Sequence, residues 1–164
     1  MDPKYVPQPP TKAEMEAFVL EDGQLTDDGE QLIIDAMAVL EEACWRITES
    51  HGFHEGGRSF GDEIALIHSE VSEALEEDRA GRPALWYSVK GTDEIFRLPI
   101  AANGDDADDL VLRKPEGAAT ELADAIVRIA DSAHDRIKDR QLGQALIRKI
   151  RYNFTRPYKH GKKY

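Results

Sequence analysis

Four segments of this sequence repeat apolar residues at intervals of three and four positions, the spacing that places them on one face of a helix. The pattern predicts helices over about 28–50 and 59–80, a third that begins near Pro115, and a fourth from about Asp139 to Pro157. An apolar helix face has to be buried against another element. The sequence therefore predicts an all-α fold, a helical bundle of about four main helices.

The apolar faces of these helices are expected to form the core. The second and third helices contribute Ile64, Ile67, Val71, Ala74 and Leu75, then Leu122, Ala125, Ile126, Ile129 and Ala133. Cys44 lies on the apolar face of the first helix and is also expected to be core. As the single cysteine, it leaves no disulfide framework and no cysteine-based zinc site.

Residues 82–115 lack helical spacing and are interpreted as an insert, a small β-hairpin or loop between the second and third helices. Two apolar runs, 86–89 and 95–98, flank the polar stretch KGTDE and predict the hairpin. The run NGDDADD that follows predicts an acidic loop. Four prolines before Thr11 indicate an N-terminal arm over residues 1–25. Residues 26–164 are then expected to form a single domain that carries the insert.

Charge excludes several classes of partner. The net charge of −11 argues against nucleic acid and anionic membranes. No stretch approaches about 18 consecutive apolar residues, so no segment is expected to span a bilayer. The N-terminus has no apolar signal region, and the expected location is the cytoplasm. Residues 148–164 differ from the acidic body, because they contain seven Lys or Arg and no acid.

Two pairs of carboxylates stand out on the predicted helices. Glu70 and Glu73 lie three residues apart on the second helix, and Glu121 and Asp124 lie three residues apart on the third. Like charges at this spacing repel one another unless a cation lies between them. A cluster with oxygen ligands alone suits Mg²⁺ or Mn²⁺. The alternative is that both pairs belong to solvated acidic faces, which are common in acidic proteins.

The wider pattern carries a family resemblance. The three segments that carry it read GDEIALIHSEVSEALEEDRAGRP, KPEGAATELADAIVRIAD and KIRYNFTRPYKHGKKY. Together they resemble the MazG-like family of all-α nucleoside triphosphate pyrophosphohydrolases, which are related in fold to the dimeric dUTPases. The family pattern of ExxE on one helix and ExxD on the next is matched by Glu70 and Glu73, then by Glu121 and Asp124. The chain departs from the family in the length of its insert.

The resemblance implies Mg²⁺-dependent hydrolysis of an NTP or dNTP to the monophosphate and pyrophosphate, as in nucleotide-pool housecleaning. The four carboxylates would hold Mg²⁺, or Mn²⁺, and carry the catalysis. Lys149, Asn153 and Arg156 match the trailing Lys, Asn and Arg of the family and would bind phosphate. The family also implies a homodimer or a dimer of dimers.

Other residues have weaker indications. Trp86 and Tyr87 are candidates for stacking on a base, or else they form the aromatic core of the insert. Asp131 and His134 are expected at the surface, and Arg82 is expected to cap a helix. A ferritin-type di-iron bundle would need Glu-x-x-His motifs that the chain does not contain. The remaining alternative is a noncatalytic helical interaction protein that keeps the fold.

Overall fold

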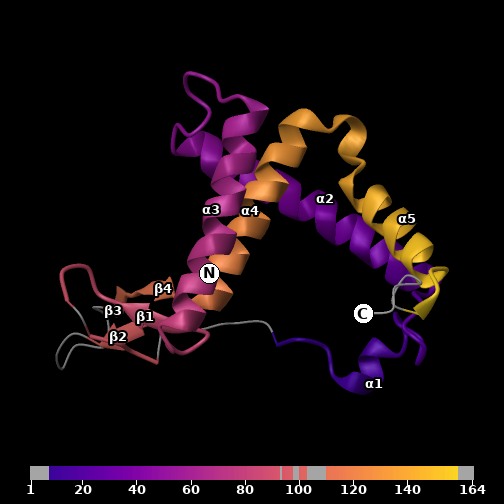
Figure 1. Ribbon diagram of the computed structural model, residues 1–164, viewed down its shortest axis with the longest axis horizontal. Coiled ribbons are helices and arrows are strands. Elements are labelled where there is room, and N and C mark those ends of the chain that lie inside the picture. The colour runs from indigo at the N-terminus through magenta and orange to yellow at the C-terminus, as the bar shows by residue number, and fades with distance from the viewer. Residues whose placement is uncertain (1–7, 93, 98–99, 103–109, 159–164) are drawn as a thin grey trace. The chain divides into compact units, whose positions relative to one another are not determined.

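The structure, a computed structural model, describes residues 8–92, 94–97, 100–102 and 110–158. Helices dominate these residues, and two short antiparallel strand pairs accompany them, which confirms the expected all-α fold with a small β insertion (Figure 1). In chain order the elements are α1 (Lys12–Met15), α2 (Asp27–Ser50), α3 (Phe60–Arg79), β1 (Trp86–Ser88), β2 (Ile100–Ala102), β3 (Leu110–Leu112), β4 (Lys114–Glu116), α4 (Ala118–Arg136), a 3₁₀ turn (Lys138–Arg140) and α5 (Leu142–Phe154). No described helix has both the length and the hydropathy that a membrane crossing needs.

The first two long helices begin at side-chain caps. The hydroxyl of Thr26 accepts a hydrogen bond from the Gly29 N–H at 3.0 Å at the start of α2. Ser59 and Asp62 form a reciprocal capping box at the start of α3, as the sequence predicts. These caps satisfy N–H groups that have no partner within the helix. Both helices therefore start where the sequence places them, within one residue.

The starts of α4 and α5 were wrongly predicted. Pro115 lies in strand β4, and α4 begins only at Ala118, after Gly117 with φ of +100°. Asp139, where the fourth helix was predicted to begin, lies instead in the 3₁₀ turn in the left-handed conformation, with φ of +57°. A short acidic side chain tolerates that conformation better than most residues do. The chain uses Asp139 to redirect the backbone before α5 begins at Leu142.

The insert is paired differently from the predicted hairpin. Strand β1 pairs antiparallel with β4, so that Trp86 lies opposite Glu116. Of the predicted pairing between residues 86–89 and 95–98, the described residues show a single bridge, between Tyr87 and Phe96. Strands β2 and β3 form a separate antiparallel pair. Leu98 and the acidic run 103–109 lie outside the described residues.

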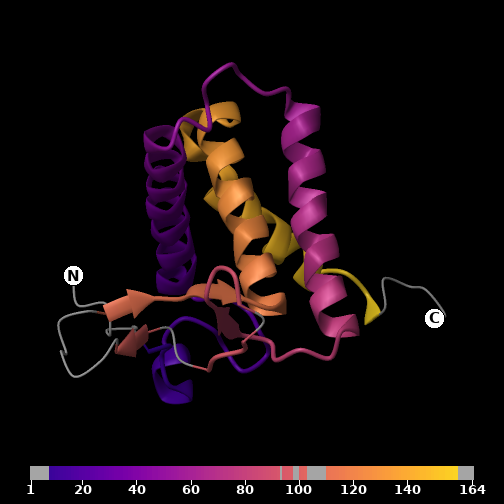
Figure 2. The ribbon, with the colours of Figure 1, turned by 90° about the vertical axis from the view of Figure 1, so that its left-hand side faces the viewer.

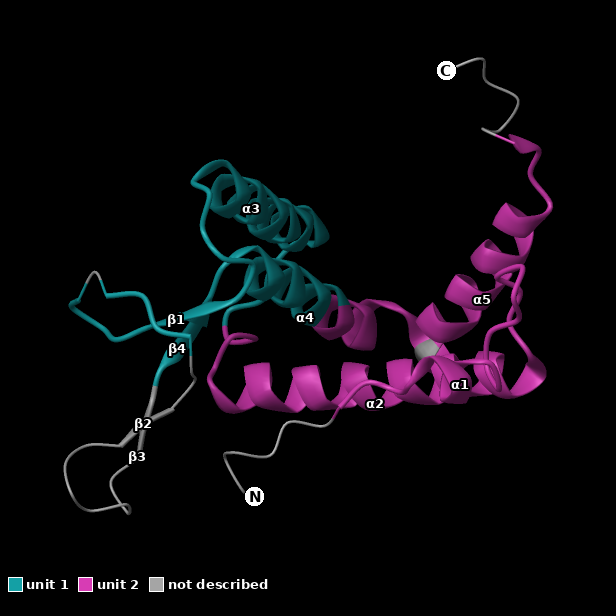
Figure 3. Cartoon of the chain, turned by 90° about the horizontal axis from the view of Figure 1, so that it is seen from below, with its two compact units in different colours: residues 1–5, 56–129 teal, residues 6–55, 130–164 magenta. Residues whose placement is uncertain are grey.

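The chain divides into two compact units (Figure 3). Residues 1–5 and 56–129 form unit 1, which contains α3, the strands and the first part of α4. Residues 6–55 and 130–164 form unit 2, which contains α1, α2, the end of α4 and α5. The division into an N-terminal arm and one domain stays a prediction.

In unit 2, α2 packs against α5, and a glycine sets their closeness. A Cβ atom at Gly143 would lie 3.1 Å from the Cα of Ile34 and 3.4 Å from the Cβ of Met37. Two hydrogen bonds join the same helices, because the guanidinium of Arg151 donates from Nε to Oε1 of Glu30 at 2.5 Å and from Nη2 to Oε2. Helix α5 is thus fixed by close backbone approach and by a bidentate ion pair.

Much of the predicted core is exposed within this chain. Alanines are buried, Ala74 on α3 and Ala125 on α4 among them. Larger apolar residues of the same predicted faces are more than a third exposed: Ile64, Val71, Leu75, Leu122, Ile126 and Ile129. Their prediction as core was wrong for the single chain, because helical spacing identifies an apolar face but not what covers it. Cys44 is buried, as predicted.

Gly117 offers a direct test of how the insert joins α4. A Cβ atom there would lie 2.7 Å from the Pro83 carbonyl oxygen and 2.9 Å from Cδ1 of Trp86, besides requiring a positive φ. We expect Gly117→Ala to lower the free energy of unfolding by roughly 2–4 kcal/mol, measured by urea denaturation. Gly81→Ala is the control, because Gly81 also has a positive φ but no atom within 4 Å of its Cβ position, and it should cost about 1 kcal/mol. Equal effects would contradict the close packing around Gly117.

Candidate metal centre

Three of the four predicted carboxylates meet between α3 and α4. One oxygen each from Glu70, Glu73 and Glu121 lies within 4.8 Å of the other two. Glu70 is buried at 6% exposure, Glu121 is half-buried and Glu73 is exposed. We call these three residues the carboxylate cluster. It has one face towards protein and one towards water, so a hydrated cation could reach it.

The helices place the cluster through simple geometry. Figure 2 shows α3 in magenta and α4 in orange running in opposite directions in unit 1. Glu70 and Glu73 are three residues apart and share one side of α3, while Ala74 continues the buried side one turn after Glu70. Glu121 lies in the first turn of α4, where the helix dipole favours a negative charge.

Burial and mutual repulsion act on the carboxyl group of Glu121. Its pKa is raised above 4.5, first by burial and then by the charges of Glu73, Asp124 and Glu70, while Lys114 acts in the opposite direction. A raised pKa in a carboxylate means that its charged form is poorly compensated. The cluster therefore carries negative charge that is not fully compensated, and a bound cation would compensate it.

Asp124 is the fourth predicted ligand and lies one turn beyond Glu121 on α4. It is not among the three residues whose oxygens meet within 4.8 Å. Its pKa is nevertheless raised, first by burial and then by Glu70, and Arg128 and Lys114 offset part of this effect. Asp124 thus experiences the charge of the cluster, and its role as a fourth ligand stays a prediction.

Two basic residues near the cluster were missed by the sequence analysis. Nε of Arg128 donates a hydrogen bond to Oε1 of Glu70 at 2.5 Å. Nζ of Lys114 contacts Oε2 of Glu116 at 2.9 Å, and the pKa of Lys114 is raised by this hydrogen bond and further by Glu116, Glu121 and Asp124. The available signal for Arg128 was its place four residues after Asp124, on the same side of the helix.

The donor set fits a hard divalent cation. The cluster offers carboxylate oxygens only, which are the ligands that Mg²⁺ and Mn²⁺ prefer, and it offers neither sulfur nor imidazole. Mg²⁺ is usually bound by one or two carboxylates together with waters and substrate phosphates. Three carboxylates with one exposed side are compatible with that mode of binding.

The candidate base-binding residues lie in β1 and already have partners. The indole Nε1 of Trp86 donates to Oε2 of Glu77 at 3.0 Å, and the Arg82 guanidinium lies 5.4 Å from the Trp86 ring centroid. Arg82 also forms an ion pair with Oε1 of Glu77 at 2.6 Å. Tyr87 bridges to Phe96 through its backbone. These contacts give both aromatic residues a structural role in the insert, and their base-binding role stays a prediction.

The candidate phosphate-binding residues lie in unit 2. Lys149 and Asn153 are exposed on α5, four residues apart, and Arg156 follows the end of that helix. Nζ of Lys149 lies 5.4 Å from the ring centroid of Tyr152. The backbone N–H of Arg156 donates to the carbonyl of Asn153 at 3.1 Å, which continues the last helical turn. The phosphate contacts of the three side chains stay a prediction.

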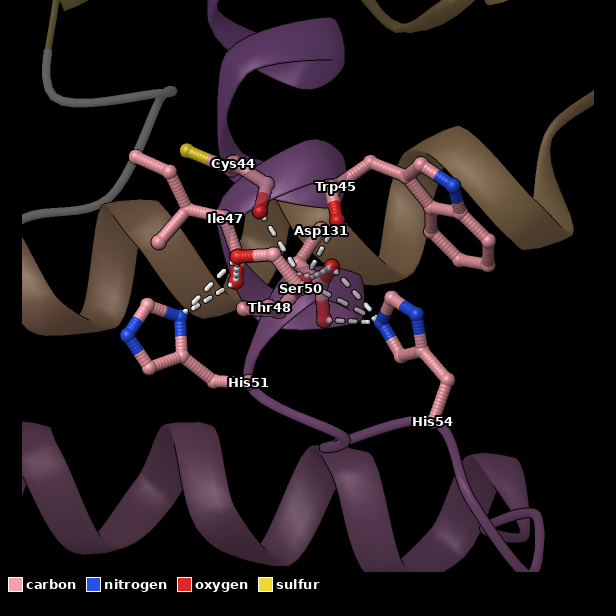
Figure 4. A network of polar contacts seen from close by, with 8 residues as sticks. All are labelled: Cys44, Trp45, Ile47, Thr48, Ser50, His51, His54 and Asp131. Carbon is pink, nitrogen blue, oxygen red and sulfur yellow. Dashed lines mark hydrogen bonds and ion pairs between the residues drawn. The ribbon is translucent and has the colours of Figure 1, made fainter.

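Unit 2 contains a polar network of its own, which the sequence did not predict. Figure 4 shows Thr48 and His54 converging on Asp131. The hydroxyl of Thr48 donates to Oδ1 of Asp131 at 2.5 Å, and Nε2 of His54 lies 3.0 Å from the same oxygen. Trp45 stacks on His54 and His134, with ring centroids 3.9 and 4.7 Å apart. Asp131 and His134 are half-buried, so their prediction as surface residues was wrong. The network ties the end of α2 and the turn after it to α4.

Comparisons of the chain with protein-family models, with curated proteins and with solved structures gave no match. The features of this chain that point to a function are therefore its carboxylate cluster and the acidic motifs of α3 and α4.

The uncompensated negative charge of the cluster predicts that Glu121→Gln changes the melting temperature in a pH-dependent way. Because the pKa of Glu121 is raised on folding, the stability that its protonated form confers is present at low pH and is lost as pH rises through the folded pKa. The glutamine stays neutral, so without metal the variant should melt roughly 2–5 °C above the wild type at about pH 7. This difference should shrink towards about pH 4.

Glu76→Gln provides the control, because Glu76 is an exposed residue of α3 outside the cluster. Its melting temperature should differ from the wild type by the same small amount at both pH values. A Glu121→Gln difference that does not depend on pH, or that has the opposite sign, would contradict the electrostatic account of the cluster.

Proposed function

We propose that this protein is a Mg²⁺-dependent pyrophosphohydrolase that converts a nucleoside triphosphate, NTP or dNTP, to the monophosphate and pyrophosphate. The observation that carries the proposal is the carboxylate cluster, in which residues from both quoted acidic motifs converge between α3 and α4. The resemblance of those motifs to the MazG-like family supplies the reaction.

The residues have distinct roles in this proposal. Glu70, Glu73 and Glu121 hold the metal, and Asp124 completes the acidic site. A triphosphate carries about four negative charges near neutral pH, so an acidic protein can approach it only when cations lie between them. Bound Mg²⁺ would supply charge neutralisation at the phosphate oxygens and activation of a water molecule. The carboxylates fix the position of that centre.

The basic C-terminal segment supplies the remaining positive charge. Lys149, Asn153 and Arg156 would contact the outer phosphates, Arg156 through two parallel donors. Trp86 and Tyr87 would contact the base from the insert.

Exposed apolar residues support a homo-oligomer, a homodimer or a dimer of dimers. Val71, Leu122 and Ile126 lie on α3 and α4 with about half of their surface in contact with water. Apolar faces of this kind usually mark interaction surfaces. The same observation favours the second candidate function, a noncatalytic helical interaction protein. The two functions differ in whether the carboxylate cluster has an activity.

The first test measures the products released from a panel of NTPs and dNTPs with Mg²⁺ or Mn²⁺. We expect pyrophosphate and monophosphate, and at least a 100-fold loss of kcat in Glu70→Gln, because one ligand of the metal is removed. Glu76→Gln should retain activity close to that of the wild type. Release of orthophosphate, or activity in Glu70→Gln equal to the wild type at saturating Mg²⁺, would overturn the mechanism. Inactivity with every nucleotide would favour the noncatalytic candidate.

The second test addresses the basic segment. A charge-assisted contact to phosphate contributes roughly 1.5–3 kcal/mol, so Arg156→Ala should lower kcat/KM about 10- to 150-fold. Divalent metal binding should stay unchanged, because Arg156 lies outside the cluster. Arg148→Ala removes an exposed arginine from α5 of the same segment and serves as the control, with an expected change below about threefold. Equal kinetics in both variants would mean that the basic segment is solvated and makes no contact with the phosphates.

A further inference from the structure

Arg128 occupies a position in the carboxylate cluster that a metal ion would also need. Its Nε lies 2.5 Å from Oε1 of Glu70, and the Glu70 side chain is only 8% exposed. An isolated buried carboxylate is strongly unfavourable, whereas one paired with a hydrogen-bonded guanidinium is tolerated. Arg128 is therefore a cation in direct contact with the most buried residue of the cluster.

Arg128 is also able to leave. Its side chain is 37% exposed, so the guanidinium has a path to water, and its long flexible stem allows the head group to move without any shift of α4. Glu70, in contrast, is held in place by its burial on α3. The mobile partner of this ion pair is thus the cation, and the fixed partner is the proposed metal ligand.

We propose that Arg128 is a resident counterion that holds the carboxylate cluster in the metal-free protein and gives up its contact with Glu70 when a divalent cation binds. The inference rests on the proposed function, because it concerns the same metal site. A guanidinium within hydrogen-bonding distance of a ligand repels a doubly charged ion bound to that ligand. Arg128 therefore stabilises the fold without metal and weakens metal binding, so that the two cations alternate at Glu70.

Metal affinity of the full-length chain tests this role. Mn²⁺ binding, followed through the electron paramagnetic resonance of free Mn²⁺, is compared in the wild type, Arg128→Gln and Arg82→Gln. Arg82 is the matched control because it forms a 2.6 Å ion pair in the same unit with Glu77, which is not one of the three residues of the cluster. We expect Arg128→Gln to bind Mn²⁺ about 3- to 30-fold more tightly, and Arg82→Gln to stay within about twofold of the wild type.

Stability is the second readout. Without metal, Arg128→Gln should melt at a lower temperature than the wild type, and saturating Mn²⁺ should remove most of that difference. An Mn²⁺ affinity in Arg128→Gln that is equal to or weaker than that of the wild type would overturn the counterion role. In that case metal binding by the wild type would still support the proposed function. Absence of Mn²⁺ binding in the wild type and in Arg128→Gln would overturn both.

A measurement on the unmodified protein covers the case in which Arg128→Gln does not fold. The ¹H–¹⁵N resonance of Arg128 Nε, assigned by its loss in Arg128→Lys, reports the hydrogen bond to Glu70 directly. Titration with Mg²⁺ should move this resonance to the position of a solvated arginine, with the same midpoint as metal binding. A resonance that stays unchanged at saturating Mg²⁺ would show that Arg128 keeps its contact, and would overturn the proposal.

Discussion

Repulsion among carboxylates between α3 and α4 is the constraint on which the site depends. Glu70, Glu73 and Glu121 bring oxygens within 4.8 Å of one another, and the burial of Glu70 limits how far water can screen the repulsion between them. Arg128 and Lys114 offset part of this repulsion, yet the pKa of Glu121 is still raised. Repulsion within the cluster destabilises the folded protein, and a bound divalent cation would remove this destabilisation. The stability of the fold is thereby coupled to the metal binding that the proposed chemistry needs.

The sequence predicts the helices because local rules decide them. The capping box at Ser59 and the apolar spacing of α2 and α3 depend on residues within a few positions of each other, and both were confirmed. The start of α4 was misplaced because Pro115 suits a first helical turn, although proline also occurs at the edge of a sheet. The long-range pairing of β1 with β4 decides between these possibilities, and no local pattern contains that pairing.

In the site, too, features set by local spacing could be predicted and features set by long-range contacts could not. Spacing along each helix placed Glu70 beside Glu73, and the resemblance linked that pair to Glu121, which the structure brings together with them. The contact of Arg128 with Glu70 joins residues 58 positions apart and could not be read from either helix. Apolar faces were identified but wrongly assigned to the core, because spacing does not show whether the covering surface belongs to this chain or to another.

The most direct test of the metal centre is a crystal structure of the full chain grown with Mn²⁺, with the ion located by its anomalous scattering. The account predicts an anomalous peak about 2.0–2.3 Å from oxygens of Glu70, Glu73 and Glu121. A peak elsewhere on the molecule, or a cluster without a peak in crystals that contain saturating Mn²⁺, would contradict the claim that these carboxylates form a divalent-cation site.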